Sequence, residues 1–274
     1  MRTSQMTSQK FDTGPKSPAS EGGSMNIKNK LGRNIKNRLG RAAAVAVASA
    51  AIGGLGLTGV ASAATAASPL QGAGSCQNID YVYQPQSAFP DTPRGRLDFL
   101  LQPTTIEKAV LCLVNAERTA LNLQPLKRFI ALRGTATLGT AAAREAADAV
   151  RLRWWGDVEP GKNCFPLKDN PSQCDPHINP QTLSTPVTRA QAVGYTRRCA
   201  SYSIGENAYV GWGVSNVTPR AAVSWWMGSP PHRANILNPN FTESYAEPAL
   251  GSADPAAGST TPAVTYVQMF GRCS

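Results

Sequence analysis

The chain contains only two histidines, His177 and His232. Imidazole is the side chain that most readily binds a metal or accepts a proton near neutral pH. Ser229 lies three residues before His232, so a hydroxyl and an imidazole could act together as nucleophile and base. From the residue types alone, each histidine could equally be structural, with His177 packed in a proline-flanked loop and His232 capping a turn. No His-Glu-x-x-His spacing joins them, so only folding could bring the two rings to one site.

Cysteines are the second chemical signal, and they number six. An even number in an exported chain indicates disulfides formed in an oxidising compartment. No Cys-x-x-Cys pair is present, which gives no support to a zinc knuckle or a redox motif. Six cysteines allow fifteen connectivities. Cys164 and Cys174 bracket a turn-bearing loop, so their positions favour a local bridge, Cys164–Cys174. Cys112 is expected on the outer side of a helix, where it can meet Cys76 of the N-terminal arm in a second bridge, Cys76–Cys112. The two cysteines that are left would form the third bridge, Cys199–Cys273.

The N-terminal 63 residues have the pattern of an export signal. A basic run at 28–41 precedes an Ala/Val/Gly stretch at 42–60 and the small residues 61–63. This order is typical of a cleaved secretory signal peptide. The alternative is an uncleaved anchor, but alanine and glycine dominate the apolar stretch, which favours cleavage and leaves no permanent membrane span. We therefore predict a signal peptide at 1–63, with a true start that could be Met25, and a secreted mature protein beginning near Ala64.

Composition favours one loop-rich domain after this signal. Of the 274 residues 42% are hydrophobic, which is enough for a core, while only 16% are charged and 45 are Gly or Pro (24 and 21). The formal net charge is +10, but residues 1–63 alone hold nine Lys or Arg against two acidic residues. The basic surplus therefore belongs mostly to the signal, and we exclude nucleic-acid binding for the body of the chain.

The elements that must position the candidate side chains follow from hydrophobic periodicity. Residues 64–103 are expected to form a linker and an extended arm, because they are rich in Pro, Gly, Ser and Gln. The domain proper is expected at 104–274. Its first helix is predicted to start at an N-cap, Thr104 or Thr105, and to end near Leu121. Further helices are expected at 138–153, at 188–195 and after Thr218–Pro219, with strands at 202–212, 244–250 and 263–270. Because the last two strands would form a hairpin after a series of helices, the fold class is α+β.

Three segments of this domain occur in a specific order. Asn115-Ala116-Glu117-Arg118 ends the first helix, Gly205-Glu206-Asn207 lies in the first strand, and Pro230-Pro231-His232-Arg233 follows Trp225-Trp226. The series resembles the bacterial branch of the CAP superfamily, also called the SCP or pathogenesis-related-1-like domain, over about 104–271. This resemblance implies a three-layer α-β-α sandwich with a cleft.

The resemblance also implies a site in that cleft. His177 matches the first histidine of the family, Glu206 its first glutamate and His232 its second histidine, while the second glutamate is missing near Gly228. These family positions are reported to hold a divalent cation, and two imidazoles with one carboxylate form an open three-ligand site that suits zinc. Glu206 has the alternative role of a buried carboxylate that organises the cleft. Three more residues are expected to line it: Asn207, Trp226 and Ser229.

The function favoured by these features is a secreted binding or interaction module at or outside the cell envelope. Its cleft is expected to take a divalent cation, and a small apolar or sterol-like ligand or a component of the envelope. The rival is a hydrolase such as a peptidase, with Ser229, His232 and Glu206 as nucleophile, base and orienter, or with a zinc-bound hydroxide. No Gly-x-Ser-x-Gly elbow surrounds Ser229, which disfavours the first version. A structural envelope protein with a vestigial cleft is the third alternative.

Overall fold

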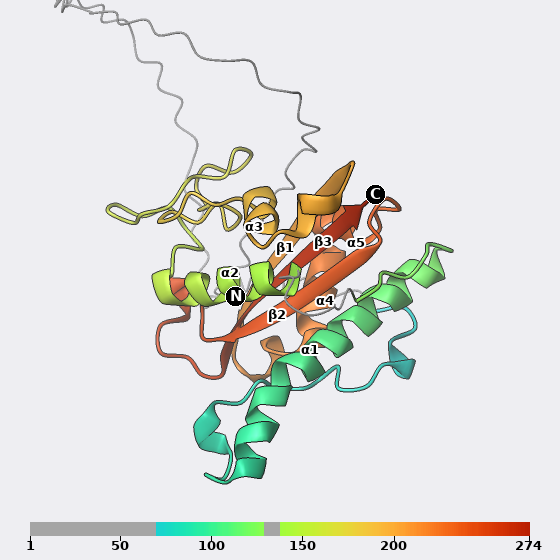
Figure 1. Cartoon of the computed structure of the whole chain (residues 1–274). Coiled ribbons are helices and arrows are strands. Elements are labelled where there is room, and N and C mark those ends of the chain that lie inside the picture. Colours follow the sequence, from blue (N-terminus) through green and yellow to red (C-terminus); the bar gives the residue numbers. More distant parts are fainter. Residues whose placement is uncertain (1–69, 129–137) are drawn as a thin grey trace, which may run out of the picture. The chain divides into compact units, whose positions relative to one another are not determined.

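The computed structural model describes residues 70–128 and 138–274, and a three-stranded antiparallel sheet lies at its centre (Figure 1). The strands are β1 (Tyr202–Trp212), β2 (Glu243–Leu250) and β3 (Ala263–Cys273). Strand β3 is central and pairs with both neighbours, in the order β1-β3-β2. The predicted strands and their late hairpin are therefore confirmed. The predicted signal peptide at 1–63 lies outside the described residues.

Helices cover both faces of the sheet, which gives the expected α+β class and three-layer α-β-α sandwich. One face carries α1 (Pro93–Ala120), α4 (Pro219–Gly228) and α5 (Pro230–Ile236). The other face carries α2 (Leu138–Leu152) and α3 (Pro186–Ala192). Short 3-10 helices lie at Ala73–Ser75, Gln86–Ala88, Tyr195–Arg198, Val214–Asn216 and Pro255–Ala257.

The alternation of side chains along β3 explains why the core has two halves. Tyr266 and Phe270 point to the face covered by α1, α4 and α5, whereas Val267 and Met269 point to the face covered by α2 and α3. Successive residues of a strand face opposite sides of the sheet, so this one central strand supplies both cores. All four side chains are fully buried.

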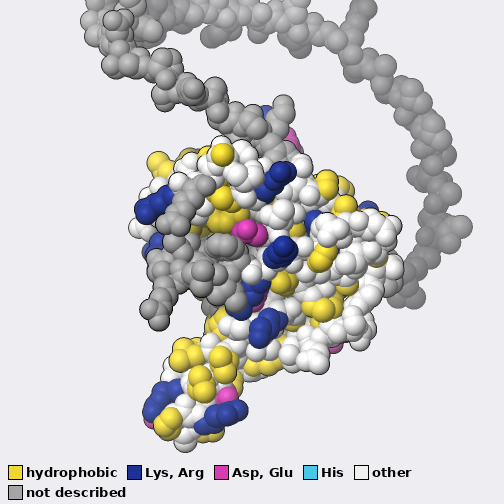
Figure 2. All heavy atoms as spheres, turned by 45° about the vertical axis from the view of Figure 1, so that its right-hand side comes forward, with side chains coloured by type: hydrophobic (Ala, Val, Ile, Leu, Met, Phe, Trp, Pro, Cys, Tyr) yellow, Lys and Arg dark blue, Asp and Glu magenta, His cyan; other side chains and the backbone are white. Residues whose placement is uncertain are grey.

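Helix α1 is longer than the sequence predicted. It begins at Pro93, and the hydroxyl of Thr92 caps it by accepting a backbone N–H of the first turn at 3.0 Å. The start predicted at Thr104 or Thr105 was therefore wrong, and Pro103 lies inside the helix. The added turns expose apolar side chains beside arginines, at the lower end of the view in Figure 2. Although α1 has 28 residues, no helix in the described ranges is both long and apolar enough to cross a membrane.

The arm that precedes α1 is held against it by a buried amide. The side chain of Gln102 is 1% exposed; it accepts the backbone N–H of Gln84 at 2.9 Å and donates to the carbonyl of the same residue at 3.0 Å. Its oxygen also accepts the hydroxyl of Tyr81 at 3.2 Å. These bonds explain why the helix continues past Pro103, because they stabilise turns that have little apolar burial of their own.

Three disulfides staple the described chain, and they join the cysteines that were expected to pair. They are Cys76–Cys112 between the arm and α1, Cys164–Cys174 within one loop, and Cys199–Cys273 between the segment before β1 and the end of β3. No cysteine in the described ranges is free.

Candidate functional site

The motif at the end of α1 holds neighbouring segments in place and takes no part in the site itself. The side chain of Asn115 exchanges two hydrogen bonds, at 2.7 and 2.9 Å, with the main chain of Leu126. The side chain of Arg118 is 1% exposed. It donates to three backbone carbonyls at 2.7–2.9 Å, those of Gln124, Ile236 and Asn238. Helix α5 and the turn after it are thereby anchored to α1.

The Gly-Glu-Asn segment of β1 is bonded directly to α5. The amide of Asn207 donates to the carbonyl of His232 at 3.2 Å. The amide of Asn235 donates to the carbonyl of Glu206 at 3.1 Å and to the side-chain oxygen of Asn207 at 2.9 Å. Gly205 is required beside this crossing, because a Cβ there would come within 2.7 Å of a ring carbon of the phenylalanine before β2. The two motifs that carry Glu206 and His232 are therefore brought together by the fold.

Glu206 is the centre of a buried charge cluster. Its side chain is 1% exposed, and both carboxylate oxygens accept hydrogen bonds from Nη2 of Arg189 at 2.6 and 2.8 Å. Nδ1 of His177 lies 2.9 Å from one of these oxygens. An ionised carboxylate can only accept, so the contact requires a proton on Nδ1 of His177. On its other side, Nη1 of Arg189 lies 3.2 Å from Oε1 of Glu145, close enough for an ion pair but outside hydrogen-bond alignment.

Burial and ion pairing shift the pKa values of the two carboxyl groups in this cluster in opposite directions. Burial by itself disfavours the ionised form of Glu206, but Arg189 and His177 outweigh it and hold the pKa of that carboxyl below its ordinary value. Desolvation, only partly offset by Arg189, raises the pKa of Glu145 to about 8. At neutral pH the two carboxyl groups and the guanidinium therefore carry no net charge together.

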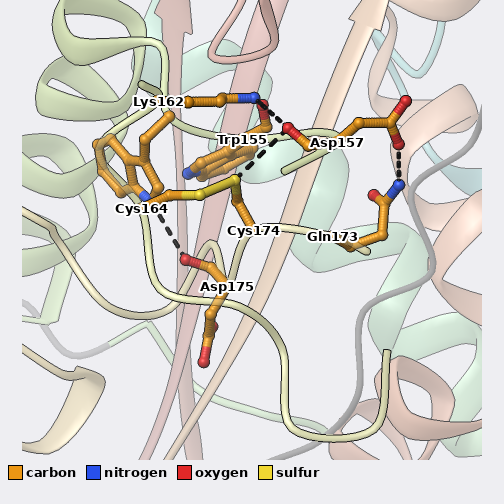
Figure 3. The surroundings of a disulfide bond; sticks show 8 residues. Trp155, Asp157, Lys162, Cys164, Gln173, Cys174 and Asp175 are labelled. Atoms are coloured by element: carbon orange, nitrogen blue, oxygen red, sulfur yellow. Dashed lines mark hydrogen bonds between the residues drawn. A yellow bond between two sulfur atoms is a disulfide. The ribbon is translucent and has the colours of Figure 1, made fainter. Parts of the chain in front are cut away.

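A loop closed by a disulfide, shown in Figure 3, precedes His177 in the sequence. Cys164 and Cys174 are joined across it. The ammonium of Lys162 donates to the carbonyls of Trp155 and Asp157 at 2.6 and 2.8 Å. Because the covalent bridge and these bonds act on the same short segment, the chain leaves Cys174 in a fixed direction.

The residue after that bridge sets the main chain of His177. The carboxylate of Asp175 accepts the backbone N–H of His177 at 2.8 Å, and its carbonyl accepts the indole N–H of Trp154 at 3.1 Å. Nη1 of Arg189 donates to the carbonyl of His177 at 3.2 Å. The position of the imidazole therefore depends on both the loop and Arg189.

His232 lies in the first turn of α5 and is 2% exposed. Its Nδ1 lies 2.7 Å from the hydroxyl of Ser229, and its ring centre lies 4.8 Å from that of Trp225. Desolvation, with a smaller effect of His177, lowers the pKa of His232 to about 3. The ring is therefore neutral over the physiological pH range.

The structure brings the three predicted ligands into one region, but they do not fit as ligands of one ion. His177 contacts Glu206, and His177 is near enough to His232 to lower its pKa. Glu206 is not free to serve as the third ligand, because Arg189 and His177 occupy its oxygens. Within 70–128 and 138–274, no three His, Cys, Asp or Glu side chains are arranged to hold a metal.

The arrangement also differs from the predicted Ser-His-Glu triad. Ser229 bonds His232, but Glu206 bonds the other histidine, so among the described residues no carboxylate is hydrogen-bonded to the ring beside the serine. Two residues expected to line a cleft are instead fully buried, and this part of the prediction was wrong. Trp226 packs in the core and donates its indole N–H to a carbonyl of β1 at 3.1 Å. Asn207 belongs to β1, and its side chain is buried against α5.

Sequence reasoning missed Arg189 and Glu145, which complete the cluster. A signal for Glu145 was present, since it shares the buried face of α2 with alanines three and four positions away, Ala141, Ala142 and Ala149. A carboxylate on an apolar helix face requires a partner. Nothing local identifies Arg189 as that partner, because α3 is seven residues long and follows a loop.

No family model matches this chain, and no curated protein is similar to it in sequence. Solved structures similar to it include an extracellular protein with an SCP domain from Bacillus anthracis, at 18% identity over 66% of this chain and 44% of that one, with a TM-score of 0.39. An outer surface protein from Borrelia burgdorferi is 17% identical over 61% of this chain and 92% of its own, with a TM-score of 0.34. A cysteine-rich secretory protein from Staphylococcus aureus is 14% identical over 62% of this chain and 38% of its own, with a TM-score of 0.32. This chain thus spans less than half of the Bacillus and Staphylococcus proteins.

Proposed function

We propose that this chain is a secreted binding module of the CAP (SCP) type, acting at or outside the cell envelope, and that it does not work as a Ser/His hydrolase. The family proposal rests on the ordered motifs and on the way Asn115, Arg118 and Asn207 tie α1, β1 and α5 together. Three disulfides support export, because such bridges persist in oxidising compartments.

The observation that carries a binding role over a hydrolytic one is the environment of His232. A general base is most effective when its pKa lies near the working pH. Desolvation lowers the pKa of His232 to about 3, which makes its ring a weak base. The carboxylate that would have to stabilise a protonated ring, Glu206, is engaged by Arg189 and His177. The imidazole bonded to Ser229 is therefore poorly suited to activate that hydroxyl as a nucleophile.

A hollow beside this segment supports a small apolar ligand. It has a volume of about 350 Å³, in the range of small-molecule sites, and lies where α4 ends and α5 begins. Its lining is mostly aliphatic, with one guanidinium: Met227, Gly228, Pro230, Arg233, Ala234 and Leu237. A mostly apolar lining with one exposed guanidinium suits an aliphatic molecule that carries an acidic head group.

The test uses the purified, oxidised protein with decanoate and decanol as probes. We expect saturable binding by calorimetry, tighter for decanoate, and at least about tenfold weaker binding in Leu237→Asp. Leu183→Asp is the matched control, because Leu183 is an exposed leucine outside the hollow, and it should bind like the wild type. Equal binding by both variants, or none by the wild type, would count against the ligand.

The hydrolase is tested separately with a serine-directed fluorophosphonate probe. The wild type and Ser229→Ala should remain equally unlabelled. Labelling of the wild type that Ser229→Ala abolishes would show an activated serine and overturn this part of the proposal.

A further inference from the structure

We infer that Arg189 is the resident cation of the buried site: its guanidinium occupies the position beside Glu206 that a divalent ion would need, so the site is charge-balanced without a metal. The inference concerns the His177–Glu206 cluster and is independent of what binds in the hollow at α4 and α5.

The first support is the occupancy of the carboxylate. Nη2 of Arg189 reaches both oxygens of Glu206, at 2.6 and 2.8 Å, and Nδ1 of His177 shares one of them at 2.9 Å. A zinc ion would have to lie at about 2.0–2.2 Å from a carboxylate oxygen. An ion that close on the side of Arg189 would overlap the guanidinium, so it could enter only if Arg189 left.

The second support is that Arg189 is fixed in place. Its side chain is 7% exposed, and Nη1 donates to the carbonyls of Ser184 at 2.9 Å and His177 at 3.2 Å. Helix α3, which carries it, begins with a capping box formed by Thr185 and Thr188. Because Nη1 and Nη2 both donate hydrogen bonds and the helix that carries Arg189 is capped, the guanidinium cannot readily change its position to admit a metal.

The third support is the charge of the surroundings. Arg189 lies between carboxyl groups from two different layers, Glu145 of α2 and Glu206 of β1. Its single positive charge therefore has acidic partners on both sides. A divalent cation added to this balanced group would be repelled by the guanidinium at short range, within a buried and weakly screened site.

If this is correct, removing the guanidinium should create a metal site. In Arg189→Met, Glu206 would be left facing His177 without a cation, and a metal could take its place with the imidazoles as further ligands. The double variant Arg189→Met/Glu206→Gln removes both charges and is the matched control, because it leaves a neutral interior without the carboxylate ligand.

The experiment titrates Co²⁺ into the purified, oxidised wild type and both variants, and records visible absorption and the unfolding temperature. We expect no saturable Co²⁺ binding in the wild type or the double variant, and about one equivalent in Arg189→Met, with a Kd at least about tenfold below the highest Co²⁺ concentration at which the wild type stays unbound. Each protein is also refolded with and without Co²⁺, because the unpaired carboxylate of Arg189→Met could prevent folding of the apo form. Recovery of this variant by Co²⁺ alone supports the inference equally.

Three results would overturn it. One is stoichiometric Co²⁺ in the wild type that is lost on Glu206→Gln or His232→Ala. Another is a folded Arg189→Met that binds no more Co²⁺ than the wild type. The third is an Arg189→Met that Co²⁺ does not rescue although the double variant folds. If neither variant folds, the wild-type titration decides, and an absence of bound Co²⁺ supports the inference.

Discussion

Replacing Arg118 with methionine should destabilise the link between α1 and α5 and identify this motif arginine as architectural. Its guanidinium makes three hydrogen bonds of 2.7–2.9 Å to carbonyls that lie up to 120 residues away in the chain. A hydrogen bond to a charged group contributes about 1.5–3 kcal/mol, so the three together bring roughly 4–9 kcal/mol before costs. Loss of the guanidinium also removes the desolvation penalty of a buried cation, which offsets part of this sum.

The net expectation is a loss of about 3–5 kcal/mol in the free energy of unfolding. For a domain of this size, each kcal/mol lowers Tm by about 2–4 °C, so Tm should fall by roughly 6–20 °C. The control is Arg144→Met, which removes an exposed arginine from α2 and should change the free energy of unfolding by no more than about 0.5 kcal/mol.

Urea unfolding followed by tryptophan fluorescence measures the loss, and hydrogen exchange shows where it acts. Amides of α5 and of the turn after it should exchange faster in Arg118→Met, while those of α2 should not. A loss below about 1 kcal/mol, or one equal to that of Arg144→Met, would refute the reasoning, because it would mean that water replaces the guanidinium at the three carbonyls at little cost.

Four further predictions follow from the same structure. Cys164→Ser/Cys174→Ser should lose about 2–4 kcal/mol in the free energy of unfolding, with faster hydrogen exchange in the loop before His177. Burial, and next the charge of Glu107, raises the pKa of Glu247 to about 7. The folded state therefore binds more protons than the unfolded state between about pH 4.5 and 7, and stability should fall as pH rises through this window; Glu247→Gln should reduce that fall in urea titrations at several pH values. Since the pKa of His232 is lowered to about 3, its ring nitrogens should show no titration by NMR between pH 4 and 8, and a midpoint near 6.5 would contradict its burial. N-terminal sequencing of protein recovered from the medium should find a start near Ala64, and a chain that retains 42–60 would indicate an anchor.

Much of the local structure could be predicted from the residues. Thr218 is the N-cap of α4 and Pro219 its first residue, as the sequence predicted. The alternation of side chains along β3 gives one strand two buried faces. The start of α1 could not be predicted, because the sequence offers two helix-start signals of equal strength. Thr92–Pro93 and Thr104 are both acceptable helix starts, and the choice between them depends on Gln102, which bonds an arm lying 18 positions earlier in the chain.

The candidate site was only half visible in the sequence. The family resemblance pointed to His177, Glu206 and His232, and the fold does bring them to one region. The sequence did not show that the carboxylate was already paired, because its partner comes from another element.

By itself, the sequence determined the segments with strong local periodicity, favoured the three disulfide pairs and indicated the residues around which a site would form. Only the tertiary structure decided what those residues do. It buries Glu206 against Arg189 and removes His232 from water, and charge state in a protein interior depends on the distance to a counter-charge and on access to water. Neither quantity is a property of a residue or of its neighbours along the chain, so both are fixed only when α2, α3, β1 and α5 pack together.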